Sequence, residues 1–222
     1  MHEGVYISWG HGVSGVSAAN RNNPVNYVDP SGLYVFANGT AEQQKAFNAA
    51  LRIASSLPQL KDVTSFYGAP GVENGVVIRF DKNIVDPITK SDILSDVTPL
   101  STVHIPISSE GNELIIIIAH EGSHIADWKN YVNALKEAFF RGDYNARSVI
   151  GNDLIDLTSY AAEVKAYGYS ITAAIGLGLK SLSYYGYEIM RNGQPNRKSL
   201  NMFLAKYYGI SPENPGSRLS QR

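Results

Sequence analysis

The 222-residue chain contains no cysteine, 2 tryptophans and 3 methionines, and it carries almost no excess of charge. The lack of cysteine excludes a disulfide framework and every zinc site built on thiolates. A net charge of −1 offers no electrostatic attraction for nucleic acid, so we expect no nucleic-acid partner. The apolar stretch 171–179 is too short to span a bilayer. No charged-then-apolar leader is visible, so we expect export to depend on a larger carrier.

A hydrophobic fraction of 44% indicates a globular domain, and its pattern predicts the α+β class, mainly helical with a small sheet. Thr40 and Gln43 form a capping box that predicts a helix to about residue 56. Further helices are expected at 113–140, 153–182 and 198–208, with a turn at 191–196. Extended segments are expected at 76–80 and 102–107, while the polar segment 81–100 is expected to cross the surface.

The most informative motif is His120-Glu121-Gly122-Ser123-His124, which follows a run of four isoleucines. On a helix, residues four apart lie on one face, so both imidazoles can bind one tetrahedral Zn²⁺. Glu121 can then reach a zinc-bound water, whose pKa falls from about 16 towards about 7, and accept its proton. The isoleucine run is also compatible with a buried strand, which would separate the two histidines. We favour the helix, and hence a metallohydrolase. Ser109 or Asn112 could cap the start of this helix.

A third protein ligand is needed, and we expect it to be a carboxylate because the remaining histidines are few. Glu163 is our choice, since its alanine-rich helix would let two helices approach closely, and a lone buried glutamate needs a partner. The alternative is a surface Glu163 paired with Lys165. Asp127 is the main competitor, although we expect it to accept the free N–H of a ligand histidine instead. Weaker candidates are Asp143, Asp153 and Asp156.

Several side chains could donate a hydrogen bond to the oxyanion of a transition state. Tyr167 is the first candidate, with Tyr160 and Tyr169 also close to Glu163 in sequence. His104 could act in the same way from the strand at 102–107. Ordinary packing is the alternative for each of them.

The motif His120-Glu121-Gly122-Ser123-His124, followed by a helical Glu163, resembles the gluzincins, a class of zincin metallopeptidases. The resemblance covers about 76–169. It implies that an edge strand precedes the metal-binding helix and binds the substrate backbone. The segment 102–107 is expected to be that strand, because Pro106 cannot donate to a sheet. The metzincin extension of the motif is not present, since residues 127 and 130 are Asp127 and Asn130.

A second motif is Asn20-Arg-Asn-Asn-Pro-Val-Asn-Tyr-Val-Asp-Pro-Ser-Gly-Leu33. It resembles the closing signature of the Rhs (YD-repeat) core, which precedes a variable toxin domain. The resemblance implies a boundary between an Rhs-derived segment, 1–33, and a toxin domain, 34–222. It also implies cleavage between Leu33 and Tyr34 with help from Asp29. No second aspartate motif is visible upstream to form a dyad, so we do not expect this chain to cleave itself.

Together the two resemblances imply a zinc metallopeptidase toxin that is secreted within a larger Rhs protein and delivered into a competing bacterial cell. The implied partners are a protein substrate in that cell, a cognate immunity protein and the Rhs core shell. One alternative is a zinc hydrolase that acts on a cell-wall amide. Another is a non-enzymatic binding module with a structural metal, in which Asp127 would complete a four-ligand shell beside Glu163.

Overall fold

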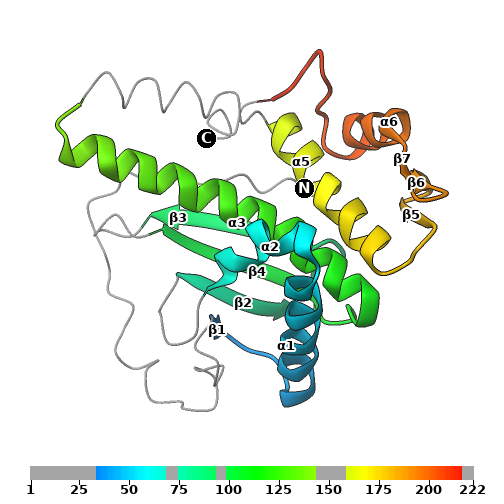
Figure 1. Ribbon diagram of the computed structural model, residues 1–222, viewed down its shortest axis with the longest axis horizontal. Coiled ribbons are helices and arrows are strands. Elements are labelled where there is room, and N and C mark those ends of the chain that lie inside the picture. Colours follow the sequence, from blue (N-terminus) through cyan, green and yellow to red (C-terminus); the bar gives the residue numbers. More distant parts are fainter. Residues whose placement is uncertain (1–33, 69–74, 94–98, 144–158, 217–222) are drawn as a thin grey trace.

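The computed structural model describes residues 34–68, 75–93, 99–143 and 159–216, which form helices and two small sheets (Figure 1). In chain order the elements are β1 (Val35–Phe36), α1 (Ala41–Ser56), η3 (Pro58–Leu60), α2 (Lys61–Thr64), η4 (Ser65–Tyr67), β2 (Val76–Asp81), β3 (Ile88–Ile93), β4 (Pro99–Pro106), α3 (Gly111–Phe140), α5 (Ser159–Gly176), β5 (Ser181–Tyr184), β6 (Tyr187–Arg191), β7 (Gln194–Pro195) and α6 (Arg197–Tyr207). This mixture of helices and sheets agrees with the predicted α+β class.

The larger sheet has the order β1-β2-β4-β3, in which β3 alone runs antiparallel to its neighbour. β4 directly precedes α3 but lies between β2 and β3, so the prediction that it is an edge strand was wrong. Pro106 is tolerated there because it is the last residue of β4. The edge is formed by β3, in a segment that we expected to be a surface crossing. The sequence of β3 is mostly polar and gives little sign of a strand. Its backbone hydrogen bonds with β4 stabilise it.

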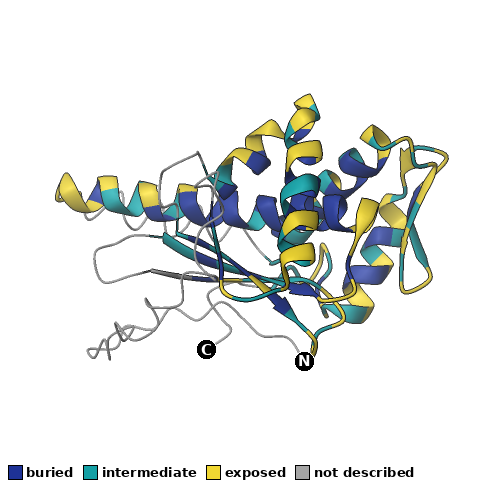
Figure 2. Ribbon diagram, turned by 90° about the horizontal axis from the view of Figure 1, so that it is seen from below, coloured by how far each residue is buried: buried dark blue, intermediate teal, exposed yellow. Residues whose placement is uncertain are grey.

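Helices α1 and α3 cover one face of this sheet and turn their buried residues towards it (Figure 2). The capping box predicted at the start of α1 is confirmed, with the Thr40 and Gln43 side chains bonded to each other's backbone. Phe47 and Leu51 of α1 pack with strand residues such as Ile78 in the core. The sheet therefore supports α3 along the part of the helix that carries the motif.

The isoleucine run is helical, as we favoured, and α3 continues to Phe140. Its residues are buried because the sheet, α1 and α5 surround this half of the helix (Figure 1). The N-cap is Glu110, without a side-chain cap, so the expected capping by Ser109 or Asn112 was wrong. The helix ends at Phe140, as predicted, and Gly142 just beyond its C-cap has a left-handed φ of 66°.

Helix α5 ends at Gly176, earlier than the predicted residue 182. The amide of Leu179 donates to the Ala174 carbonyl at 2.9 Å, and Gly178 between them has a φ of 74°. These are the features of a glycine-terminated helix. The residues that follow form the hairpin β5–β6, which we did not predict. Helix α6 is confirmed, with Asn196 as its N-cap.

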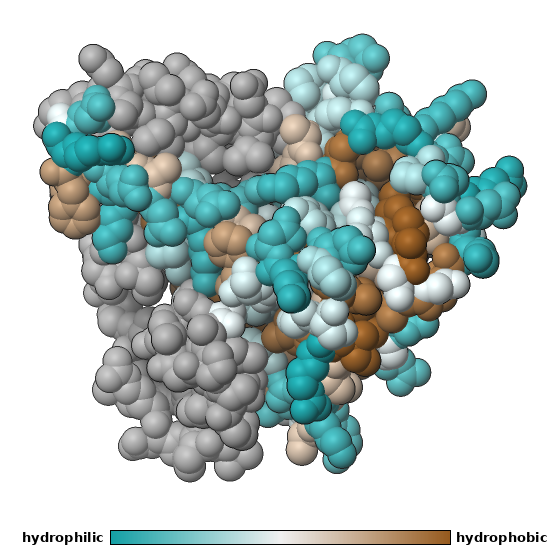
Figure 3. All heavy atoms as spheres, in the orientation of Figure 1, coloured by the Kyte–Doolittle hydropathy of each residue, from teal (hydrophilic) through white to brown (hydrophobic). Residues whose placement is uncertain are grey.

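The first described residue, Tyr34, is 4% exposed and bonds Asn48 through its hydroxyl. Asp29 and Leu33 lie outside the described residues. In the part of the chain that the structure describes, no helix has the length and apolar character needed to cross a membrane. The face drawn in Figure 3 is mainly hydrophilic, with hydrophobic residues reaching the surface around α1 and the end of α5.

Candidate metal centre

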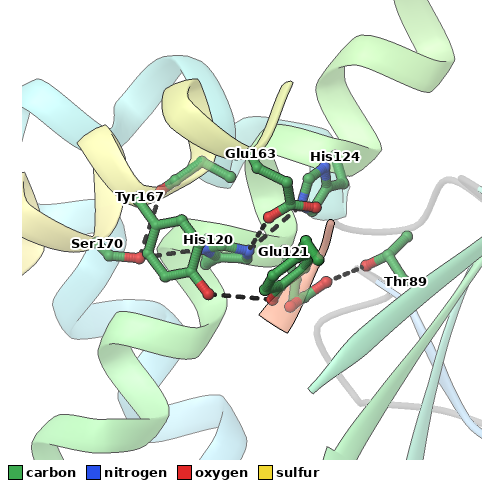
Figure 4. Close-up of polar contacts among 9 residues, drawn as sticks. Thr89, His120, Glu121, His124, Glu163, Tyr167 and Ser170 are labelled. Carbon is green, nitrogen blue, oxygen red and sulfur yellow. Dashed lines mark hydrogen bonds and ion pairs between the residues drawn. The ribbon is translucent and has the colours of Figure 1, made fainter. Parts of the chain in front are cut away.

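The three predicted ligands come together where α3 and α5 pack along each other (Figure 4). His120 and His124 lie one turn apart on α3, and Glu163 faces them from α5. His120 is 8% exposed, and the Glu163 side chain is 17% exposed. Each residue offers one ligand atom, and these atoms all lie within 4.8 Å of one another. The cluster is therefore buried but not sealed from solvent.

The distances in the cluster match one face of a coordination tetrahedron. The two histidine Nε2 atoms are 3.3 Å apart. The Glu163 carboxylate lies 3.5 Å from His120 Nε2 through Oε2 and 3.6 Å from His124 Nε2 through Oε1. Ligands about 2.1 Å from a tetrahedral zinc ion lie about 3.4 Å from one another. These three side chains could therefore bind a metal ion with little rearrangement.

The carboxylate also affects the charge state of the histidines. Burial by itself lowers the pKa of His120, but the hydrogen bond and charge of Glu163, together with Glu121, outweigh it and raise the pKa. The raised pKa means that this imidazole binds a proton more readily than an ordinary histidine does. A metal ion would compete with that proton for the same lone pair.

Ser170 determines which nitrogen of His120 faces the cluster. Its Oγ lies 3.2 Å from His120 Nδ1 and donates to the Ala166 carbonyl at 3.3 Å. With its own proton used in this way, the Ser170 oxygen is free to accept from the Nδ1–H tautomer of His120. The lone pair of the neutral imidazole is then on Nε2, towards Glu163.

Glu121 lies beside the ligands, between α3 and the sheet (Figure 4). It is 1% exposed, and its Oε2 accepts a hydrogen bond from Thr89 Oγ1 of β3 at 2.6 Å. Burial raises the pKa of Glu121, although His120 and Thr89 oppose the shift. A carboxylate with a raised pKa next to these three candidate ligands is suited to accept and return a proton.

Glycine at position 122 allows α2 to approach the motif. A Cβ built there would lie 3.1 Å from the Val63 carbonyl oxygen and 3.2 Å from Tyr67 Cε2. Tyr67 itself donates to the Ile118 carbonyl at 3.1 Å. The small residue inside the motif is therefore needed for packing behind the ligands.

Asp127 does not have the role that we predicted. Its Oδ1 accepts from Lys165 Nζ at 2.6 Å, and neither ligand histidine is among its hydrogen-bond partners. The same pair removes the alternative in which Lys165 neutralises Glu163. It also links α3 to α5 one turn beyond His124. Asp127 thus stabilises the helix pair that carries the ligands.

His104 lies on the face of the sheet opposite to the cluster, so it is not placed to act as an oxyanion donor. Thr89 pairs with Val103, so these two side chains share the face of the sheet that is turned towards α3. His104 is the next residue along β4 and points to the opposite face, where it contacts Asp81 at 3.6 Å. The prediction for His104 was wrong because sequence gives no strand orientation.

Among the tyrosines, Tyr167 adjoins the cluster. Its ring packs edge-on against His120 with centroids 4.6 Å apart, and its hydroxyl lies 3.1 Å from the Tyr208 hydroxyl. Tyr160 and Tyr169 bond Asn201 and Asp62 instead. Of the weaker ligand candidates, Asp143 follows the end of α3, outside the cluster, and Asp153 and Asp156 lie outside the described residues.

Three residues at the site were missed by sequence reasoning. Ser170 had a signal, because it lies seven residues after Glu163 and hence on the same face of α5. Thr89 had none, since only the sheet brings it to Glu121. Tyr208 directly follows α6, and burial together with the charges of Glu163 and Glu121 raises the pKa of its hydroxyl.

Comparison with known proteins identifies no relative of this chain. No family model, no curated protein and no solved structure matches this chain.

Proposed function

We propose that this protein is a zinc-dependent metallopeptidase of gluzincin type. The observation that carries the proposal is the triangle of His120, His124 and Glu163 ligand atoms, with Glu121 on the same helical turn. Two imidazoles and one carboxylate are the protein ligands of known catalytic zinc sites. Calcium and magnesium prefer oxygen ligands throughout, so this set favours zinc over either.

A zinc ion held there would supply a Lewis acid and lower the pKa of a bound water to about 7. Glu121 accepts the proton of the attacking water and then passes it to the leaving amine. Its buried position and raised pKa support both steps. The Tyr208 hydroxyl, which lies 3.1 Å from the hydroxyl of Tyr167 beside His120, would donate to the oxygen on which negative charge develops.

The edge strand β3 supports a peptide as the substrate. Its outer edge has no partner strand among the described residues, and Thr89 on this strand contacts Glu121. An extended peptide could pair with this edge through main-chain hydrogen bonds. Its scissile bond would then lie beside the catalytic carboxylate.

A structural metal is less well supported than a catalytic one. Structural zinc sites have four protein ligands. The cluster found among the described residues has three, and Asp127, the expected fourth, is bonded to Lys165. Three protein ligands are the number typical of catalytic zinc sites.

The biological role is proposed from the Rhs-like motif that ends at Leu33. We infer a toxin that reaches a competing bacterium as part of a larger Rhs protein. An immunity protein would neutralise it in the producing cell.

The test compares the unmodified protein with Glu121→Gln, and with Glu113→Gln as the matched control. Glu113 is an exposed glutamate in the first turn of the same helix. Glu121→Gln should bind one zinc ion per chain but lose at least about 10²-fold in peptide cleavage and lose toxicity on induction. Glu113→Gln should retain all three properties. Cleavage by Glu121→Gln at the unmodified rate would contradict the proposal, and cleavage of cell-wall fragments but no peptide would favour an amidase.

A further inference from the structure

The hairpin between β5 and β6, which follows α5, contains a residue in a strained backbone conformation. Tyr184 pairs with Tyr187, so the loop consists of Tyr185 and Gly186. Their φ angles are 50° and 83°, as in a type I′ turn. The first position of this turn favours Asn, Asp or Gly, and a bulky residue with positive φ is uncommon. Such strain persists where the surrounding structure holds the residue in place, often at functional sites.

Contacts of the Tyr185 side chain hold it in this conformation. Its ring stacks on Tyr207 with centroids 4.8 Å apart. Its hydroxyl donates to Asp86 Oδ2 at 2.6 Å, and this bond raises the pKa of Tyr185 to about 12. Tyr185 remains 48% exposed, so the core does not require its ring. The side chain therefore connects the hairpin to the loop that precedes β3.

This connection joins the two sides of the metal centre. On one side, Asp86 lies three residues before Thr89, the residue bonded to Glu121. On the other, the hairpin follows α5, the helix of Glu163, and Tyr184 packs against Tyr167 with ring centroids 5.2 Å apart. A substrate peptide paired with β3 beside Thr89 would therefore run into the Tyr185 side chain at the beginning of β3.

We propose that the Tyr185–Asp86 bond closes the substrate path at the start of β3 and makes the enzyme a peptidase of carboxyl ends. This inference rests on the proposed peptidase function. Antiparallel pairing, the slightly more stable arrangement, directs the carboxyl end of a bound peptide towards Asp86. At about 3.3 Å per residue, the three residue steps from Thr89 to Asp86 span about 10 Å. The released fragments are therefore short, up to about three residues.

The experiment follows cleavage products of unstructured synthetic peptides by mass spectrometry, with the same peptides cyclised head to tail. The zinc-loaded unmodified protein should trim carboxyl ends and leave cyclic peptides intact. Tyr185→Asn removes the ring and suits the turn, so the fold should be retained. It should raise cleavage of cyclic peptides and internal bonds roughly 10- to 100-fold, the factor for a hydrogen bond to a charged acceptor. Asp86→Ala removes the acceptor of the same hydrogen bond and should raise the same cleavage by a similar factor.

Tyr169→Phe is the matched control, because it removes a similar exposed tyrosine–aspartate bond, to Asp62 at 2.5 Å, away from β3. It should leave the product pattern unchanged. Equal cleavage of cyclic and linear peptides by the unmodified protein would overturn the inference, as would an unchanged pattern in both Tyr185→Asn and Asp86→Ala. These outcomes leave the peptidase function intact. Failure to cleave any peptide would overturn the proposed function, and the inference with it.

Discussion

Replacing Ser170 by alanine should weaken metal binding without touching a ligand. Ser170 is fully buried, and its Oγ lies 3.2 Å from His120 Nδ1, within hydrogen-bond distance. In the variant, the Nδ1–H group has lost its acceptor, and the neutral imidazole can place its proton on Nε2 instead. Loss of such a partner typically reduces metal affinity 10- to 100-fold, or about 1.4 to 2.8 kcal/mol. The metal-free fold should change by about 1 kcal/mol or less, because alanine favours the helix.

Zinc affinity is measured by competition with a chromophoric chelator, and unfolding of the metal-free protein by denaturant. Thr172→Ala is the matched control, since Thr172 donates to the Gly168 carbonyl in the same i−4 manner, at 2.9 Å. It lies two residues beyond Ser170, and hence on another face of α5. Equal affinities for Ser170→Ala and the unmodified protein would refute the tautomer argument. If Thr172→Ala lost as much zinc affinity as Ser170→Ala, the effect would come from a change in the helix and not from the histidine tautomer.

Two further predictions concern Tyr208 and Lys129. Tyr208→Phe should lower kcat by about 10²-fold while KM and zinc content stay unchanged, because the variant lacks the hydroxyl that we expect to donate to the oxyanion; a change in KM alone would contradict this. Lys129 is 7% exposed and donates to the Phe66 carbonyl at 2.8 Å, and burial lowers its pKa from 10.5 to about 8. The unfolded chain therefore binds more protons between these values, and stability should rise with pH from about 8 to 10.5. Relative to Lys129→Met, denaturant unfolding should show a gain of up to about 3 kcal/mol over that window, and parallel pH profiles would contradict the assignment.

The parts of the site that sequence predicted are those in which local spacing determines geometry. His120, Glu121 and His124 are four residues or fewer apart, so the helical period alone places them. Glu163 was found through composition, because small neighbours and a lone acid indicate close helix packing. The capping box of Thr40 and Gln43 depends on the same short range. All of these predictions concern the interior or start of a helix.

The parts that sequence did not predict depend on pairing between distant segments. β3 was missed because its alternation is weak, and β4 supplies its ladder. The β5–β6 hairpin was missed because Tyr185 stands where an asparagine or glycine would have signalled the turn. The edge strand was assigned to 102–107 from Pro106, but a proline at the end of an inner strand gives the same pattern. Strand order is a property of the whole sheet, and single segments do not encode it.

Thr89 shows why the sheet matters for the proposed chemistry as well as for the fold. Its hydroxyl donates a hydrogen bond to Glu121, which is 32 positions away in sequence. Thr89 lies on β3, the strand to which we expect the substrate to bind. Burial raises the pKa of Glu121, and the hydrogen bond from Thr89 opposes the shift. A peptide lying along β3 would exclude more water and raise that pKa further. The contact with Thr89 would then keep the carboxylate in place as its proton affinity increases, which couples substrate binding to activation of the base.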